Sequence, residues 1–257
     1  MNIDLEIIKP FGPQILIAKC PEKILNQLND FAKRVDNNNQ DKKLYSSLSG
    51  NIPNLLLRDL ENIFLPQDFC REIGLKILLE TLTNTYHDNY FKTGPKENYK
   101  LGVISPPDSK GNGGFVNCDK IIYSDCWINR YFSGKYTPIH THGGGISGII
   151  FLEIPEKEIK QESLQNCKSE GYDYAGNDEG RDCGRVLFLY GSNQEYCESI
   201  WKPEQLVGNI LIFPSWLQHL VYPLKTNKER RTLSFNLIVE DVYYDIMEQY
   251  YEDYQGD

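Results

Sequence analysis

Hydrophobic and polar positions alternate at the start of the chain and then change to a helical spacing. The segments LEIIKP and QILIAK are typical of strands, and a turn at residues 11–13 separates them. From Pro21 onward the apolar residues recur mainly three and four positions apart, which predicts a helix; they are Ile24, Leu25, Leu28, Phe31 and Ala32. A second stripe of this kind predicts a helix from about Pro66 through Tyr86 that covers one face of a sheet, with His87 just past its end.

From about residue 120 the pattern changes to that of strands. Segments rich in apolar and β-branched residues follow one another, bounded by Gly, Pro or Asn: KIIYSDCWINRYF, TPIHTH, ISGIIFLEIP, RVLFLY, ESIWKPEQLVGNILIFP, HLVYPL and RRTLSFNLIV. Strands in this arrangement predict an antiparallel sandwich or barrel. The hydrophilic stretches 92–117 and 156–184 are predicted to be loops, and the first is long enough for a lid or a binding loop.

Composition and charge restrict the classes of partner. The chain has 257 residues, of which 40% are hydrophobic and 25% charged, as in a globular domain. A net charge of -9 disfavours nucleic acid and anionic membranes as partners. The seven cysteines are odd in number and form no Cys-x-x-Cys pair, so we interpret them as free thiols. Because the chain also lacks a signal-peptide pattern and an apolar run of membrane-spanning length, we expect it in the cytoplasm of a bacterium or of a virus-infected host cell.

Three of the four histidines are candidates for a metal site. If residues 138–142 are extended, alternation places His140 and His142 on one face of a strand, close enough to share a metal ion. His219, in a strand-like run far downstream, would supply the third ligand of a facial site that leaves positions open for substrate and oxygen. The alternative is that these polar histidines are merely exposed or hydrogen-bonded.

An arginine follows the third histidine on a further predicted strand. Alternation places Arg230 on one face together with Thr232, Ser234 and Asn236, whereas Arg231 points the other way. An arginine pairs with a carboxylate through two parallel hydrogen bonds, so Arg230 beside a metal would form a carboxylate receptor. The alternative is that both arginines are charges at the rim of the barrel.

These motifs, taken in order, resemble those of the Fe(II)- and 2-oxoglutarate-dependent oxygenases, and specifically an oxygenase family of marine bacteria and cyanophages. The resemblance covers roughly residues 120–240. Its motifs are W-x-N at Trp127 and Asn129, H-x-H at His140 and His142, S-G at Ser147 and Gly148, F-P-S-W-L-x-H at Phe213 to His219, and R-x-T-x-S-F-N at Arg230 to Asn236.

The resemblance implies a fold and a division of the chain. The fold is mainly β with flanking helices: a double-stranded β-helix, which is a jelly-roll or cupin-like barrel, with N-terminal helices packed on the sheet. We expect an N-terminal region at residues 1–110 that packs on the core, a catalytic core at 111–240, and an acidic, tyrosine-rich tail at 241–257.

The resemblance also implies a chemistry. Fe(II) is held by the three candidate histidines, and Arg230 with Thr232 grips the distal carboxylate of 2-oxoglutarate. Asn129 or Tyr131 on the preceding strand is a further expected contact of this cosubstrate. The expected activity is that of a dioxygenase which uses O2 to hydroxylate a small-molecule or peptide substrate.

One position departs from the wider superfamily, in which a carboxylate stands where this chain has His142. A neutral ligand leaves the site one charge more positive. Glu153 or Asp125 could ligate instead, although neither has the matching spacing. The rival interpretations are a cupin-like metal enzyme without 2-oxoglutarate and a metal-free β-sandwich that serves as a binding or structural module. If all three histidines bind metal, affinity is expected to fall as the pH drops through about 6.5.

Overall fold

The structure is a computed structural model of the chain. It describes residues 4–37, 61–93, 121–143, 145–156, 183–192, 194–196 and 198–239.

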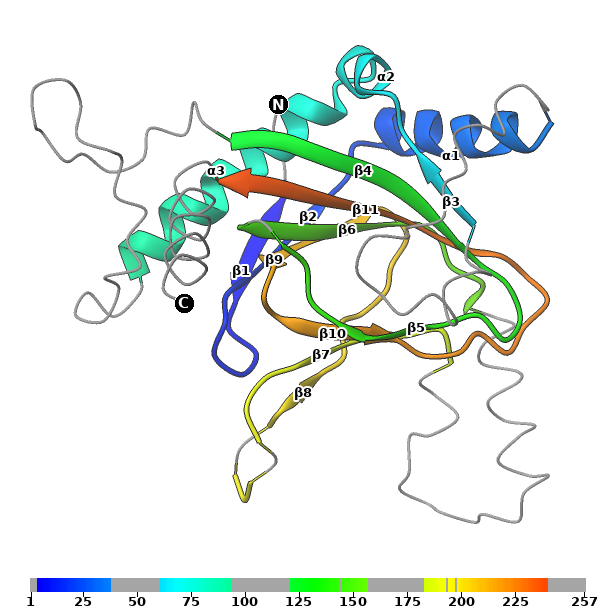
Figure 1. Cartoon of the computed structure of the whole chain (residues 1–257). Coiled ribbons are helices and arrows are strands. Elements are labelled where there is room, and N and C mark those ends of the chain that lie inside the picture. Colours follow the sequence, from blue (N-terminus) through cyan, green and yellow to red (C-terminus); the bar gives the residue numbers. More distant parts are fainter. Residues whose placement is uncertain are drawn as a thin grey trace, which may run out of the picture.

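Two antiparallel sheets face each other across an apolar interior (Figure 1). The larger sheet has the order β1 (Leu5–Ile8), β2 (Ile15–Lys19), β9 (Asn209–Pro214), β6 (Ile146–Glu153), β11 (Arg230–Val239), β4 (Ile121–Tyr131) and β3 (Glu61–Phe64). The smaller sheet has the order β5 (Thr137–His140), β10 (Gln218–Val221), β7 (Val186–Leu189) and β8 (Ile200–Trp201). This architecture is a double-stranded β-helix, and it confirms the predicted fold class.

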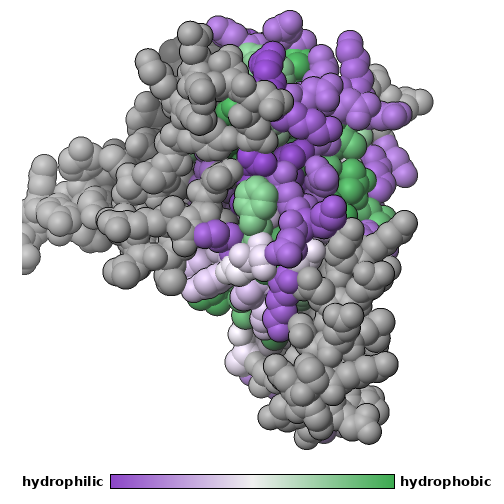
Figure 2. All heavy atoms as spheres, turned by 90° about the vertical axis from the view of Figure 1, so that its right-hand side faces the viewer, coloured by the Kyte–Doolittle hydropathy of each residue, from purple (hydrophilic) through white to green (hydrophobic). Residues whose placement is uncertain are grey.

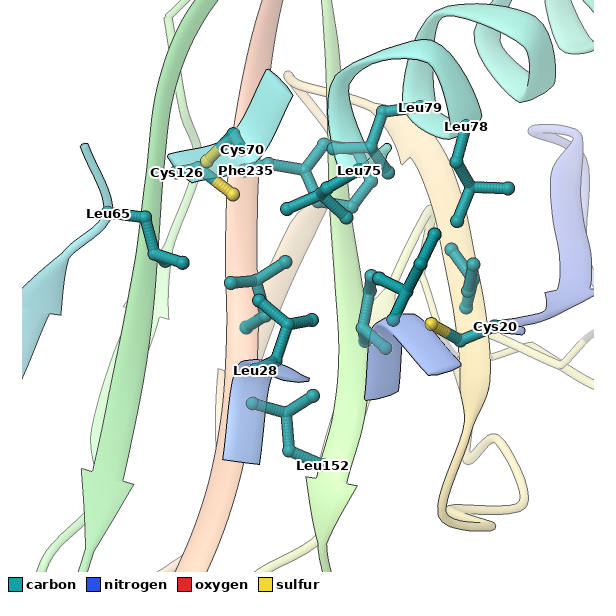
Figure 3. Packing of buried hydrophobic residues seen from close by; sticks show 14 of the residues in the cluster. Cys20, Leu28, Leu65, Cys70, Leu75, Leu78, Leu79, Cys126, Leu152 and Phe235 are labelled. Carbon is teal, nitrogen blue, oxygen red and sulfur yellow. The ribbon is translucent and has the colours of Figure 1, made fainter. Parts of the chain in front are cut away.

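Helices cover the outer face of the larger sheet, and their buried positions follow the sequence pattern. They are α1 (Glu22–Asn37), α2 (Gln67–Glu72) and α3 (Leu75–Thr93). Figure 3 shows Leu28 of α1 and Leu75 and Leu79 of α3 above the strands that carry Leu152 and Phe235. All five side chains are almost completely buried, so this helix-on-sheet layer forms one core of the protein.

The prediction of the second helix is wrong in two respects: the segment forms two helices, and the second of them extends beyond Tyr86. It is divided at Gly74, whose φ of 79° lies in the left-handed region that glycine adopts at little cost, and so it forms α2 and α3 rather than one element. Helix α3 then continues to Thr93. His87 therefore lies within a helix and not just past its end.

N-terminal segments also extend the larger sheet. Strand β2 pairs with β9, β1 pairs with β2, and β3 pairs with β4. Strand β3 has no counterpart in the sequence prediction. Residues 94–117, most of the predicted loop 156–184 and the tail at 241–257 lie outside the described residues, and the proposed boundaries between the three regions remain predictions.

A second core lies between the sheets. Its fully buried residues include Phe151, Phe188 and Phe213. Strand alternation divides the two cores: Ile149 of β6 belongs to the inner one, and the neighbouring Ile150 belongs to the outer one under the helices.

Gly148 of the S-G motif lies where β6 runs beneath an aromatic ring. A Cβ atom at this position would stand 2.1 Å from Cζ of Phe235 and 2.7 Å from the backbone oxygen of Leu211. The position therefore requires glycine for packing, although its backbone conformation is an ordinary one.

The end of the barrel on the right-hand side of Figure 1 carries the turn from β4 to β5 and the connection from β10 to β11. Figure 2 shows that the described surface at this end is largely hydrophilic, with scattered apolar side chains. Among the described residues, no helix has both the length and the apolar character that crossing a membrane requires.

Candidate metal centre and carboxylate site

The three histidines converge from two neighbouring strands and a loop. His140 ends β5 and lies directly opposite His219 of β10 in the strand register. The expectation that the strand continues through His142 is wrong, because β5 ends at His140 and the backbone N–H of His142 donates to the carbonyl oxygen of Ser215 at 2.9 Å. His142 nevertheless belongs to the cluster. One ligand atom of each histidine lies within 4.8 Å of the others, a grouping that could hold a metal ion.

Backbone contacts orient two of the rings. Nδ1 of His140 lies 2.8 Å from the carbonyl oxygen of Pro138, and Nδ1 of His219 lies 2.9 Å from that of Leu217. Because a carbonyl oxygen only accepts, each Nδ1 must carry the proton, and each Nε2 keeps its lone pair. Nε2 of His142 and Nε2 of His219 are 3.2 Å apart, so the metal-binding nitrogens point at a common region.

Burial keeps these imidazoles neutral. Burial is the main cause that lowers the pKa of His140 and His219, and it lowers the pKa of His142 to about 4, with a further lowering by His140. The pKa of about 6.5 assumed from sequence for metal binding therefore does not apply. The histidines of the folded protein are ready to bind a cation without first losing protons near neutral pH.

Aromatic rings enclose the cluster on its inner side. His219 is buried against Phe213 and Phe188, with ring centroids 5.1 and 5.7 Å away, and the ring of Trp127 lies 6.3 Å from that of His142. His140 and His142 are only partly buried. The cluster is therefore open toward one side and walled by apolar rings on the other.

Arg230 is a fully buried cation in the inner core. Its Nη2 donates to Oε1 of Gln205 at 2.8 Å, and its guanidinium lies over the ring of Tyr131, 4.9 Å from the centroid. Its Nε and Nη1 are buried and have no hydrogen-bond partner within the described part of the chain. Burial lowers the pKa of Arg230 to about 10, which still leaves it charged at neutral pH. A buried cation with two unmatched donors fits a carboxylate ligand.

The other residues predicted to bind the cosubstrate lie on two neighbouring strands. Thr232 is on β11 with Arg230, and Asn129 and Tyr131 are on β4. In the register of β4 and β11, Arg230 pairs with Tyr131 and Thr232 pairs with Asn129. The hydroxyl of Tyr131 lies 2.8 Å from that of Thr137, and burial is the main cause that raises its pKa. Asn129 already has partners, because its Oδ1 accepts from Nε1 of Trp127 at 3.0 Å and its Nδ2 donates to Ser234 at 2.7 Å.

Arg231 has the opposite environment. It donates to both carboxylate oxygens of Glu229, at 2.9 and 2.7 Å, and to Asn29 of α1 at 2.9 Å. It also lies 3.1 Å from Glu153. The interpretation of the two arginines as rim charges is wrong, since both are buried. Glu153 faces Arg231 and is not part of the histidine cluster.

Gln205 is a functional candidate that sequence reasoning missed. It lies in the irregular segment between β8 and β9, where no periodicity or motif marks it. Only the structure brings it to Arg230.

The fold and the site together have the form expected of Fe(II)- and 2-oxoglutarate-dependent oxygenases. Residues 125–236 match the sequence model of a family described as "Putative 2OG-Fe(II) oxygenase", which confirms the resemblance drawn from the motifs. That family implies Fe(II) and 2-oxoglutarate as cofactors, and the three histidines could bind the metal.

Solved structures of such enzymes are similar to the chain, at low sequence identity. A Pseudomonas putida prolyl-4-hydroxylase has 12% identity and a TM-score of 0.49, covering 91% of each chain. A Trichoplax adhaerens prolyl hydroxylase, solved with a peptide fragment of hypoxia inducible factor, has 14% identity and a TM-score of 0.49, covering 93% of this chain and 84% of that one. The epimerase SnoN of nogalamycin biosynthesis, described as non-heme and alpha-ketoglutarate dependent, has 8% identity and a TM-score of 0.50 over 87% of this chain and 76% of its own. This last likeness shows the shared fold. The comparison with curated proteins found no match.

Proposed function

We propose that the chain is an Fe(II)- and 2-oxoglutarate-dependent hydroxylase that acts on a small-molecule or peptide substrate with O2. The proposal rests on the environment of the Arg230 side chain. A fully buried guanidinium with two unpartnered nitrogen atoms is costly to the folded state unless a ligand completes it, and it stands in the same barrel as the histidine cluster.

In this proposal His140, His142 and His219 hold the metal through their Nε2 atoms. The protonated Nδ1 atoms of His140 and His219 fix the ring orientations, because their backbone acceptors lie on the same strands or the adjoining turn. When bound, Fe(II) and 2-oxoglutarate together supply the O2-dependent oxidation in which 2-oxoglutarate becomes succinate and CO2.

Arg230 orients the cosubstrate by binding its distal carboxylate. Thr232 and Tyr131 contribute hydroxyl groups on the same region of the barrel wall, and Asn129 completes the set proposed for this ligand. Phe151, fully buried with its ring 6.0 Å from the guanidinium of Arg230, helps to keep water from the carboxylate site. Exclusion of water strengthens the attraction between the guanidinium and a carboxylate.

The neutral His142 leaves the metal site without a carboxylate ligand, unless an acid elsewhere takes its place. Asp125 is the alternative ligand that the sequence left open. Replacing His142 tests this directly. If Asp125 ligates, His142→Ala keeps its affinity for Fe(II), whereas loss of affinity supports the three-histidine site.

The cytoplasm remains the proposed compartment. The side chains of Cys20, Cys70, Cys126 and Cys183 are buried thiols, which suits a reducing environment.

The test is an anaerobic titration of the full chain with Fe(II) and then 2-oxoglutarate. We expect the visible charge-transfer band of the chelate to appear, and slow formation of succinate once O2 is admitted. Arg230→Met serves as the control that keeps the metal site but removes the carboxylate receptor. Tight Fe(II) binding with no binding or consumption of 2-oxoglutarate would favour a cupin-like metal enzyme. Failure to bind any divalent metal would favour a metal-free binding module.

A further inference from the structure

Gln205 is the one described side chain that hydrogen-bonds to Arg230, and it does so with a neutral acceptor. Its Oε1 accepts from Nη2 of Arg230 at 2.8 Å and from the backbone N–H of Val186 at 3.3 Å. Both partners are donors, so the atom facing them must be the amide oxygen. The carbonyl is therefore held between the start of β7 and the buried guanidinium.

Arg231, the next residue on the strand, has charged acceptors and so contrasts with Arg230. Arg231, on the outer face, is bonded to the carboxylate of Glu229 and paired with Glu153, so its charge is compensated inside the protein. Arg230 has no carboxylate partner among the described residues, and two of its nitrogen atoms remain unmatched. The same strand thus carries one compensated and one uncompensated buried arginine.

We propose that Gln205 is a positioning residue that fixes the guanidinium of Arg230 with an uncharged acceptor and so reserves the arginine's charge for the distal carboxylate of the cosubstrate. This inference rests on the proposed function. One hydrogen atom of Nη2 points at Gln205, and the remaining donors keep an edge of the guanidinium free for a two-point contact. A carboxylate in place of the amide would occupy Arg230 as an internal ion pair and compete with the ligand.

The variant that separates charge from structure is Gln205→Glu. Glutamate keeps an oxygen acceptor at nearly the same position for both Val186 and Arg230, and so preserves the local fold. Gln194→Glu is the matched control, because it adds the same charge at an exposed position. Gln194 precedes β8 in the sequence, whereas Gln205 follows it. Gln205→Leu is a second variant, which removes the acceptor and leaves the N–H of Val186 without this partner.

The experiment measures binding to the full chain loaded anaerobically with Fe(II), by calorimetry, for two ligands. One is 2-oxoglutarate. The other is 2-oxopentanoate, which has the same chelating end and chain length but no distal carboxylate. We expect Gln205→Glu to weaken 2-oxoglutarate binding by roughly 30-fold or more, the scale of close buried charge pairs, and to leave 2-oxopentanoate binding within about twofold. Gln194→Glu should change neither.

Thermal unfolding of the metal-free protein supplies the second readout. Gln205→Glu should unfold at the same or a higher temperature than the wild type, because it neutralises a buried cation, whereas Gln205→Leu should unfold at a lower one. Unchanged 2-oxoglutarate binding in Gln205→Glu, or equal weakening of both ligands, overturns the inference. A wild-type protein that binds neither ligand overturns the proposed function instead, so the two failures are distinguishable.

Discussion

Adjacent buried arginines on β11 should respond in opposite ways to the same substitution. Methionine is an unbranched apolar residue that fills the volume of the arginine stem without a charge. We expect Arg231→Met to destabilise the metal-free protein strongly, and Arg230→Met to leave its free energy of unfolding nearly unchanged or to raise it. Only Arg230→Met should abolish 2-oxoglutarate binding.

The magnitudes follow from the partners that each substitution leaves behind. Arg231→Met leaves Glu229 with one arginine instead of two and leaves Asn29 of α1 without its donor. Breaking a buried pair by removing one partner typically costs about 3 to 5 kcal/mol, and the remaining bond from Arg130 to Glu229 places this case near 3 kcal/mol.

Arg230→Met, by contrast, removes a buried charge and two unmatched donors. It forfeits one hydrogen bond to Gln205 and the contact with the ring of Tyr131, each worth about 1 kcal/mol. The desolvation of the guanidinium offsets these losses, so we expect a net change within about 1 kcal/mol.

Urea denaturation followed by circular dichroism measures both variants against the wild type, and calorimetry with 2-oxoglutarate measures the function. The reasoning is refuted if Arg230→Met destabilises the protein as much as Arg231→Met does. That outcome would mean that Arg230 has internal partners and is not held ready for a ligand. Equal loss of 2-oxoglutarate binding in two folded variants would refute the assignment of the two strand faces.

Further predictions concern the packing and the metal site. Gly148→Ala should destabilise the protein by about 3 kcal/mol in urea denaturation, since neither the buried ring of Phe235 nor the strand backbone has room to move; a change below about 1 kcal/mol would contradict the packing argument. The histidine pKa values are lowered by folding, so their contribution to stability is full above the unfolded value of about 6.5 and is lost as the pH falls toward about 4, the pKa of His142. Metal-free protein should therefore lose stability over this pH range, and His142→Gln should reduce the slope; a flat profile would be inconsistent with burial of neutral imidazoles. His142→Asp should retain Fe(II) binding measured by calorimetry, because it restores the commoner ligand set, and failure to bind would show that the loop does not bring a shorter side chain to the metal.

The pattern of strands predicted an antiparallel sandwich or barrel, because strands are marked by regular alternation, and the family resemblance narrowed this to the double-stranded β-helix. The two arginines show this well. Strand β11 pairs in register with β4 from Arg230 through Asn236, and its first irregularity on that side comes after Asn236, so the assignment of opposite faces to Arg230 and Arg231 holds. The histidine pair shows the limit. Alternation placed His142 on a strand, whereas the strand ends at His140 and the backbone of His142 bonds to Ser215, far away in sequence.

Other features had no local signal. Gly74 divides a continuous apolar stripe, and a stripe alone does not distinguish one helix from two that share a face. Strand β3 is recognised only through its pairing with β4, a contact between segments far apart in sequence. Gln205 belongs to no periodic element, and its importance arises only from its meeting with a residue 25 positions away.

The uncompensated charge of Arg230 and the neutral imidazole of His142 both leave the proposed site more positive. Each leaves its end of the site with positive charge that the described residues around it do not neutralise, once a divalent metal is held by imidazoles. A dianionic 2-oxo acid carries one carboxylate for each of these ends. Binding of such a ligand therefore stabilises the folded state through both contacts, in proportion to the logarithm of its concentration over its dissociation constant. The protein without metal and cosubstrate is then the least stable form, and the same buried charge that lowers its stability provides the affinity for the ligand.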